Sequence, residues 1–160
     1  MSSCTFGVSG FESPSALSYA LPSMPTPTAS ACPFCTLPSS RIVIANELAV
    51  VIRDAYPVVT GHTLVIPRRH IGSFFDLELV EREAMLRLLD AVRRELDGTL
   101  HPAGYNIGVN DGPAAGQTVP HVHMHLIPRF VGDQADPRGG VRWIFPERAD
   151  YWSASGGESD

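Results

Sequence analysis

A single stretch of helical periodicity, set between short β-branched runs, constrains the fold of this chain more than any other feature. In LELVEREAMLRLLDAVRREL the apolar residues fall on one stripe at helical spacing. The stripe consists of Met85, Leu88, Leu89, Val92 and Leu96. Asp76 is a suitable N-cap before it, and Gly98 is predicted to end the helix. Because an amphipathic stripe on a lone helix usually packs on a sheet, we predict one long helix against a sheet.

Five short runs around this helix are typical of strands. RIVIANELAVVIRD predicts two strands, around residues 42–45 and 48–53, joined at Asn46-Glu47 as a tight hairpin. Residues 61–67 predict a third strand that ends at its proline. GYNIGVN and HVHMHLIP predict two more, with the Gly-rich loop DGPAAGQTVP between them. This order of elements predicts an α+β domain with an antiparallel five-stranded sheet and one main helix.

Composition divides this chain of 160 residues into three parts. Residues 1–31 are rich in Ser, Pro, Thr and Ala and lack a periodic pattern, which predicts a disordered extension. They contain no Lys or Arg, so we expect no targeting signal there, and Met24 is an alternative start. Residues 32–152 form the predicted domain, and residues 153–160 a predicted flexible C-terminal tail.

Charge and cysteine content restrict the partners. The formal net charge is −5 and no basic stripe is visible, which argues against a polymeric nucleic acid partner but not against a single nucleotide. No run of about 18 apolar residues is present, so we predict no membrane partner. The three cysteines, two of them in a C-x-x-C pair, do not fit a secreted disulfide framework and favour a cytoplasmic location.

The stretch HVHMH holds the densest group of reactive side chains. Side chains alternate along a strand, so His121, His123 and His125 are expected on one face at intervals of about 6.7 Å. Val122 and Met124 then face the core. Because the three imidazoles span roughly 13 Å, a single zinc ion held by all three is disfavoured. An inert core strand remains an alternative.

The composition of the loop before this stretch favours a reactive site over an inert core strand. NDGPAAGQTVP contains two glycines, a hydroxyl and two amides, a composition that can turn backbone N–H groups toward an anion. Most Gly-rich loops are simply turns. Next to a histidine-lined strand, however, an anion-binding loop makes phosphoryl or nucleotidyl transfer chemically coherent, because a neutral imidazole is a nucleophile near pH 7.

GQTVPHVHMHLIPR resembles the signature of the histidine triad family, His-φ-His-φ-His-φ-φ with φ apolar, and GHTLVIPRRHI resembles that family's upstream strand. The resemblance covers residues 32–129 and implies a homodimeric α+β nucleotide hydrolase. It identifies His123 as the nucleophile that attacks an α-phosphorus and forms a nucleotidyl-histidine intermediate. His125 would lie beside the phosphate and leaving group, His121 would help to hold the imidazoles, and His62 would buttress the site.

The resemblance also implies nucleotide-binding residues. Asp54 would bind ribose hydroxyls, a role that suits a carboxylate accepting from two hydroxyl donors. Ile42 and Ile44 would form the slot for the base. Three further residues would contact phosphate oxygens or the leaving group: Asn110, Gln117 and Thr118. The alternatives are a strand-end histidine for His62, a turn aspartate for Asp54 and ordinary core isoleucines.

The implied substrates are adenosine-type nucleotides with a leaving group on the α-phosphate, either dinucleoside polyphosphates or nucleoside phosphoramidates, cleaved without a catalytic metal. Asn110 is typical of the phosphoramidase-like branch, whereas the tail GDQADPRGGVRW resembles bacterial diadenosine polyphosphate hydrolases. That tail carries Trp143, Ile144 and Phe145, which we expect to be buried. The alternatives are a nucleotidyltransferase or phosphorylase, in which another acceptor replaces water, and a nucleotide-binding regulator with little turnover.

The pair CPFC raises the possibility of a metal. By resemblance, Cys32, Cys35, His70 and His121 would hold a structural zinc ion, and two Cys with two His make a sound tetrahedral set. Unliganded thiols are the alternative, because one C-x-x-C pair is weak evidence for a metal. Zinc would give His121 a structural role that competes with its role among the imidazoles.

Overall fold

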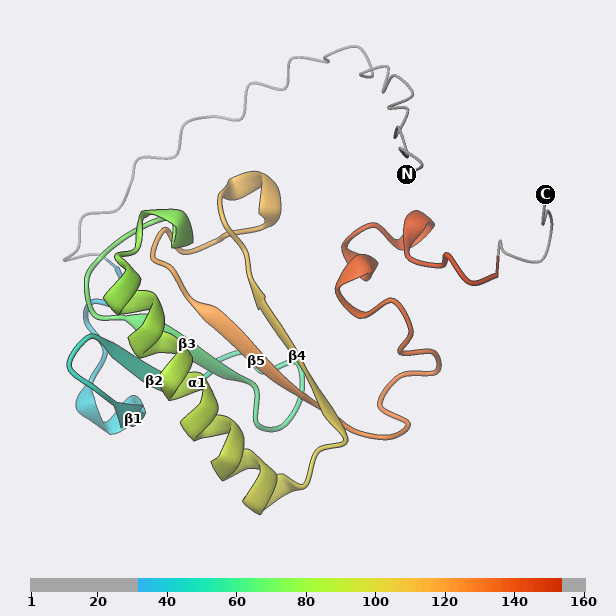
Figure 1. The fold of residues 1–160 in the computed structure, drawn as a ribbon, viewed down its shortest axis with the longest axis horizontal. Helices are drawn as coiled ribbons and strands as arrows, with labels where there is room; N and C mark the ends of the chain where they lie inside the picture. Colours follow the sequence, from blue (N-terminus) through green and yellow to red (C-terminus); the bar gives the residue numbers. More distant parts are fainter. Residues whose placement is uncertain (1–31, 154–160) are drawn as a thin grey trace, which may run out of the picture.

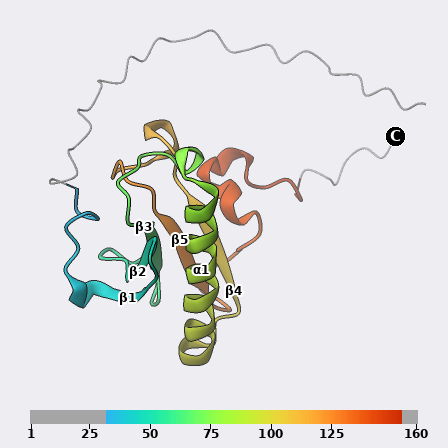
Figure 2. The same cartoon turned by 60° about the vertical axis from the view of Figure 1, so that its left-hand side comes forward.

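A computed structural model describes residues 32–153 of the chain, which form a five-stranded antiparallel sheet with one long helix against one face (Figures 1 and 2). The strands are β1 (Ile42–Ala45), β2 (Ala49–Arg53), β3 (Thr63–Pro67), β4 (Gly104–Val109) and β5 (Met124–Arg129), and the helix is α1 (Leu79–Leu100). Short 3-10 helices span Ser39–Arg41, Phe74–Asp76, Pro113–Ala115, Gly140–Ile144 and Pro146–Arg148. The strand order is β1-β2-β3-β5-β4, which confirms the predicted α+β class.

The start of α1 lies later than predicted, at Leu79, and Glu78 rather than Asp76 is its N-cap. The carboxylate of Glu81 accepts a hydrogen bond from the Glu78 N–H at 2.9 Å. The same carboxylate accepts from Arg69 at 2.6 Å, which ties the first turn of the helix to the end of β3. This capping box satisfies backbone donors that Asp76, inside a 3-10 turn, cannot reach.

The end of α1 also lies later than predicted, because the helix runs through Gly98 to Leu100. Gly98 is exposed, and a glycine inside a helix costs only about 1 kcal/mol relative to alanine. The helix stops where His101 takes a left-handed conformation, with φ of 49°, directly before Pro102. Proline lacks the N–H that would continue the helix, so it terminates α1 more effectively than the glycine.

The β1–β2 hairpin has a three-residue connection, 46–48, so the predicted two-residue turn at Asn46-Glu47 was one residue too short. The Asn46 side-chain oxygen accepts hydrogen bonds from the N–H groups of Leu48 and Ala49, at 3.0 and 2.8 Å. Its amide donates to the Ala84 carbonyl in α1 at 3.0 Å. One asparagine therefore shapes the turn and fastens it to the helix.

The strand that carries the histidines begins at Met124, three residues later than predicted. Before it, the Val122 N–H donates to the Ile71 carbonyl at 2.8 Å instead of joining a strand ladder. The predicted alternation nevertheless continues through this segment. Val122 and Met124 both pack in the core beneath α1, whereas the rings of His123 and His125 contact each other with centroids 5.1 Å apart.

The sheet has apolar side chains on both faces. The core beneath α1 joins the helix stripe to β2, β3 and β5; its buried members are Ala49, Val51, Val65, Leu77, Met85, Leu88, Val92, Leu96, Val122, Met124 and Leu126. A second cluster consists of Val50, Ile52, Leu64 and Ile66, with Phe34, Leu37 and Ile42 packed against it. Leu64 pairs with His125 across β3 and β5, so the second cluster shares a face with the histidines. We call this the histidine face.

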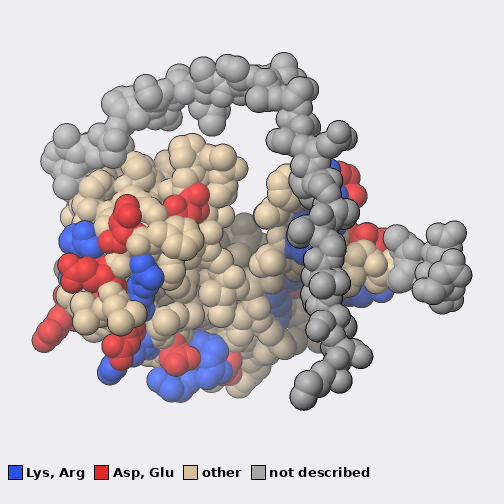
Figure 3. Space-filling model, turned by 45° about the horizontal axis from the view of Figure 1, so that its top comes forward, with Lys and Arg blue, Asp and Glu red and all other residues tan. Residues whose placement is uncertain are grey.

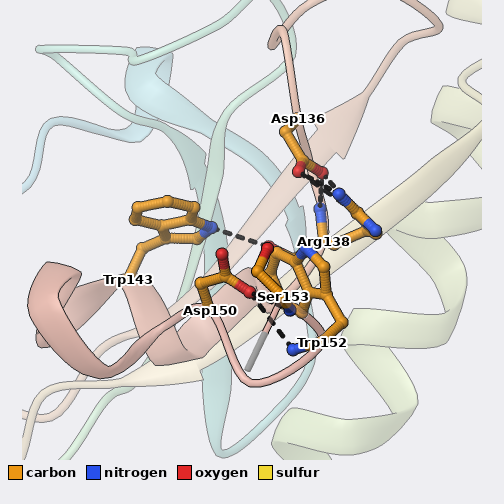
Figure 4. Close-up of polar contacts among 6 residues, drawn as sticks. All are labelled: Asp136, Arg138, Trp143, Asp150, Trp152 and Ser153. Carbon is orange, nitrogen blue, oxygen red and sulfur yellow. Dashed lines mark hydrogen bonds and ion pairs between the residues drawn. The ribbon is translucent and has the colours of Figure 1, made fainter. Parts of the chain in front are cut away.

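After β5 the chain continues as a C-terminal segment, residues 130–153, which lies beside β4 (Figure 1). Its aromatic and aliphatic side chains were expected to be buried, but Trp143, Ile144 and Phe145 are 45%, 77% and 59% exposed. The prediction was wrong because the segment is held by polar contacts instead of by a core. Figure 4 shows several of them, including the Trp143 indole N–H donating to the Arg138 carbonyl at 2.7 Å.

The predicted disordered extension, residues 1–31, and all but the first residue of the predicted flexible tail lie outside the described residues. Among residues 32–153, no helix is both long and apolar enough to cross a membrane.

Candidate active site and metal centre

Two cysteines and two histidines meet at the edge of the histidine face. The Sγ atoms of Cys32 and Cys35 lie 3.4 and 3.5 Å from Nδ1 of His121, and the Cys35 Sγ lies 3.3 Å from Nδ1 of His70. All four donor atoms lie within 4.8 Å of one another. Ligands of a tetrahedral zinc ion are roughly 3.3–3.8 Å apart, given bond lengths of about 2.0–2.3 Å. The four residues therefore fit zinc, and we call them the Cys/His cluster.

The orientation of His121 supports a ligand role. Its Nε2 lies 2.9 Å from the Pro67 carbonyl oxygen, which can only accept, so the proton is on Nε2. The lone pair of the neutral ring is then on Nδ1, the atom that faces the two thiols. A metal-binding histidine typically has its other nitrogen fixed in this way. In this arrangement His121 belongs to the Cys/His cluster, and its ring is not hydrogen-bonded to the other triad histidines.

The middle histidine, His123, is held by the backbone of the first. Its Nδ1 lies 2.8 Å from the carbonyl oxygen of His121, so Nδ1 carries the proton and donates it. The neutral ring consequently keeps its lone pair on Nε2, the nitrogen that a nucleophile needs. His123 is only 7% exposed, and the ring of Phe34 packs edge-on against it with centroids 5.2 Å apart.

The third histidine, His125, belongs to a chain of hydrogen bonds that begins in the loop before β3. The Val58 N–H donates to Nδ1 of His62 at 3.3 Å, which leaves the proton of a neutral His62 on Nε2. That N–H donates to Nδ1 of His125 at 2.9 Å. The His125 proton is therefore on Nε2, a buried atom with no hydrogen-bond partner among the described residues. Asp54 approaches the same chain, with Oδ2 at 3.4 Å from Nδ1 of His62.

Burial lowers the pKa of His125 and of His62 and so favours their uncharged forms. The pKa of His125 falls to about 4, mainly because burial disfavours the imidazolium, with His123 and His62 adding to the effect. Burial also lowers the pKa of His62, although the Asp54 carboxylate opposes the shift. A neutral His125 can donate a hydrogen bond from Nε2 without adding a positive charge to the site.

The buried histidines predict a loss of stability in acid. In the unfolded chain His125 has a pKa of about 6.5, whereas in the folded chain its pKa is about 4, so only the unfolded chain takes up this proton between those two pH values. The free energy of unfolding therefore falls as the pH drops below 6.5, and His125 contributes about 2 kcal/mol of that loss between pH 7.5 and pH 5. Urea unfolding at the two pH values measures this change. The His125→Asn variant is expected to show a smaller difference, and an equal difference would contradict this origin.

The Gly-rich loop is braced by its own side chains. The Gln117 side-chain oxygen accepts from the Gly112 N–H, and its amide donates to the Gly72 carbonyl, both at 2.8 Å. Asp111 accepts from the Phe74 N–H at 2.6 Å. The side chain of Gln117 therefore holds the loop and is not free to meet a phosphate. Asp111 was not among the predicted site residues, although its position between a predicted strand and the Gly-rich loop was an available signal.

Two further loop residues remain available for a ligand. Asn110 and Thr118 are both exposed. Asn110 follows β4 directly after the pair formed by Val109 and Met124, so it lies at the end of the sheet where His123 precedes β5. Asn110 therefore lies near His123, and Thr118 lies farther along the loop.

The two isoleucines expected to form one base slot lie on opposite sides of the sheet. Ile42 packs against the second cluster on the histidine face, whereas Ile44 packs against the core beneath α1. A register shift between them accounts for the difference, because it breaks the simple alternation of β1. Phe34, which the sequence analysis missed, packs with Ile42's cluster and contacts His123. Its place inside the C-x-x-C pair was the available signal.

Charged side chains show no single-sign patch on the face drawn in Figure 3, where arginines, the chain's only residues of the Lys/Arg class, are interspersed with Asp and Glu around a broad uncharged area. That mixture offers no basic track for a polymeric nucleic acid on this face.

Comparisons with known proteins agree with this geometry. A family model described as HIT domain matches residues 38–132. An uncharacterised HIT-like protein of Mycoplasma genitalium is 38% identical over 107 residues, 64% of this chain and 76% of the relative. The asymmetrical bis(5'-nucleosyl)-tetraphosphatase of Schizosaccharomyces pombe is 35% identical over 94 residues, 59% of this chain and 52% of the relative. A Zn-bound histidine triad family protein from Mycobacterium smegmatis superimposes with a TM-score of 0.61 at 36% identity, covering 68% of this chain and 82% of that chain.

Proposed function

This chain belongs to the HIT domain family, and from that premise we propose that it hydrolyses nucleotides that carry a leaving group on the α-phosphate. The substrates we propose are dinucleoside polyphosphates or nucleoside phosphoramidates of the adenosine type. The similarity to a bis(5'-nucleosyl)-tetraphosphatase supports this class. The observation that carries the proposal is the 2.8 Å hydrogen bond from His123 Nδ1 to the His121 carbonyl, since it leaves Nε2 unprotonated.

In the first step we propose, His123 Nε2 attacks the α-phosphorus. An N–P bond forms while the bond to the leaving group breaks, and the leaving group takes the electron pair. The unpartnered Nε2–H of His125 supports a role as donor to the leaving atom, because a fixed donor stabilises charge as it develops. The product of this step is a nucleotidyl-histidine whose ring keeps its Nδ1 proton.

In the second step water attacks phosphorus, the N–P bond breaks, and a nucleoside monophosphate leaves. The proton lost by water goes to solvent, and His123 returns to its neutral form. Asp54, 15% exposed beside His62, is proposed to bind the ribose hydroxyls, and Ile42 with Phe34 to contact the base. We propose phosphate contacts for Asn110 and Thr118, and for Gln117 an indirect role through the loop that it braces.

Assays of nucleoside monophosphate release test the proposal against its alternatives. Purified protein is incubated with diadenosine tetraphosphate and with adenosine phosphoramidate, each with and without added inorganic phosphate. A hydrolase releases AMP without added phosphate, whereas a phosphorylase requires it and forms ADP. Binding of either compound without measurable turnover would favour a nucleotide-binding regulator and overturn the proposal.

Two properties of the whole protein are proposed with this activity. The Cys/His cluster would hold a structural zinc ion, which supplies a cross-link between residues 32–35 and the active strand but no step of the reaction.

We also propose a homodimer, supported by β4, which is an edge strand of the sheet and carries Ile107 at 47% exposure. Light scattering of the purified protein tests the dimer. A cytoplasmic location remains a prediction from the cysteine content.

A further inference from the structure

A cavity of about 650 Å³ lies over β4 and β5, and the histidines are not among its lining residues. Asn106 and Ile127, which pair across β4 and β5, contribute to its lining. Val58 and Val59 contribute from the loop before β3, and the C-terminal segment contributes residues that include Trp143. A volume of this size lies within the range of about 300–1,000 Å³ that is typical of small-molecule sites.

Two structural links connect this cavity to the reacting centre. Ile127 follows His125 by two positions in β5, so both side chains point to the histidine face at a spacing of about 6.7 Å. Val58 donates its N–H to His62, the residue that orients His125. A group that leaves the α-phosphorus next to His125 is therefore one same-face position along β5 from a residue that lines the cavity. The second apolar cluster, with Ile42 and Phe34, lies toward the other edge of the sheet, on β1, β2 and β3.

The polar groups of the cavity suit a nucleoside better than a phosphate. Arg129, the only cation in its lining, forms a two-pronged ion pair with Asp133, both contacts at 2.8 Å, and donates to Asn106 at 2.6 Å. Asp136 also lines the cavity and is paired with Arg138 at 2.7 Å. With its cation neutralised, the cavity offers no strong anion site. It offers instead an indole ring and apolar side chains.

Trp143 is the residue best placed to bind a flat aromatic group. Its indole N–H donates to the Arg138 carbonyl (Figure 4), and its ring, 45% exposed, lines the cavity. Val58, Val59 and Ile127 add apolar surface. A base stacked on one aromatic side chain contributes favourably whatever its identity, because every base has a π-face.

The wall that carries Trp143 is held in place before any ligand arrives. Gly139 and Gly140 both have positive φ, 84° and 49°, and a Cβ at Gly140 would lie 3.4 Å from the Asn106 amide nitrogen. This close approach brings the segment onto β4. Arg142 donates to the carbonyls of Arg148 and Ala149, at 2.8 and 3.3 Å, and closes the segment on itself.

We propose that this cavity is a subsite for the second nucleoside of a dinucleoside polyphosphate, the part that departs with the leaving group. The inference rests on the proposed function and narrows it, since a phosphoramidate has no second nucleoside to place there. Trp143 then is the surface on which the base packs, beside the apolar side chains of Val58, Val59 and Ile127.

Two substrates that differ only beyond the phosphate chain test the subsite. Diadenosine tetraphosphate and adenosine 5'-tetraphosphate share the α-phosphate and the chain, but the second lacks the second nucleoside. The readout is the ratio of their KM values. Trp143→Ala is expected to raise the KM for the dinucleotide about tenfold relative to that for the mononucleotide, the loss of one stacked base. Phe145→Ala, an exposed aromatic of the same segment outside the cavity lining, is the matched control and should leave the ratio unchanged.

Val58→Ala is a second test of the subsite, needed in case the tryptophan variant misfolds. The Val58 side chain is 72% exposed and the substitution keeps the backbone N–H, so this variant should fold normally. It is expected to shift the KM ratio in the same direction by a few-fold. If the wild type cleaves both compounds and neither variant changes the ratio, the subsite is wrong while the proposed function stands. If the wild type cleaves neither compound, the proposed function fails and this inference fails with it.

Discussion

Replacing His123 with alanine is expected to lower the rate of AMP release from diadenosine tetraphosphate by at least about 10³-fold, because it removes the attacking atom itself. The effect should appear in kcat. The imidazole array consists of His62, His123 and His125. Among the described residues of this array, His123 alone has one ring nitrogen bound to a backbone carbonyl, at 2.8 Å, which leaves its other ring nitrogen unprotonated. Initial rates measured with a coupled AMP assay give the comparison.

The covalent intermediate provides a second readout for the same variant. Wild-type protein mixed with substrate and then denatured at alkaline pH, where an N–P bond survives, should gain the mass of one nucleotidyl group, located on His123 by peptide mass spectrometry, and the variant should not. His101→Asn is a matched control, since His101 is an exposed histidine at the C-cap of α1, where asparagine tolerates the left-handed backbone. Equal rates for wild type and His123→Ala would remove His123 from the reaction, and activity lost in His101→Asn would point to a general folding defect.

Replacing Cys32 with serine is expected to abolish zinc retention and to lower the melting temperature by at least about 10 °C. A structural Cys and His site contributes its metal-binding free energy to folding, often about 10 kcal/mol or more, so losing one thiolate forfeits much of it. Elemental analysis should find about one zinc per chain in the wild type and little in the variant. The melting temperature is measured with and without chelator.

Two further variants separate metal loss from local packing. Cys32 is completely buried, so a serine there also buries a hydroxyl, whereas Cys35 is exposed and Cys35→Ser removes a ligand with little change in packing. Both should lose zinc. Cys4→Ser, the same substitution outside the described residues, is the control and should retain it. Less than about a tenth of an equivalent of zinc in wild type purified without chelator would refute the metal site.

Periodicity predicted the secondary structure well, and its errors have physical causes. The stripe that includes Met85, Val92 and Leu96 is buried beneath α1 as expected, since period 3.6 leaves few alternatives. The ends of the helix were wrong because Glu81 forms a capping box and because Pro102 stops a helix that Gly98 does not. A glycine inside a helix costs only about 1 kcal/mol relative to alanine, so the presence of Gly98 did not by itself mark the end of the helix.

The candidate site was harder to predict where it depends on tertiary contacts. The Cys/His cluster joins residues 89 positions apart in the chain, and only the resemblance indicated that Cys32 and His121 would meet. Strand alternation could not show that Ile42 and Ile44 would separate, because the register shift lies between them. The packing of the C-terminal segment was also missed, because ion pairs such as Arg129 with Asp133 leave no hydrophobic periodicity.

The hydrogen bond from His123 to the backbone of His121 has a consequence for how the reaction responds to salt. Many catalytic histidines are oriented by a carboxylate, and that pairing is an interaction between charges. Here the acceptor is an uncharged peptide carbonyl. Dissolved ions screen charges and leave such a contact unaffected. We therefore expect the reactive tautomer of His123 to be maintained equally at low and high ionic strength, so that any effect of salt on turnover reports on substrate binding and not on the nucleophile.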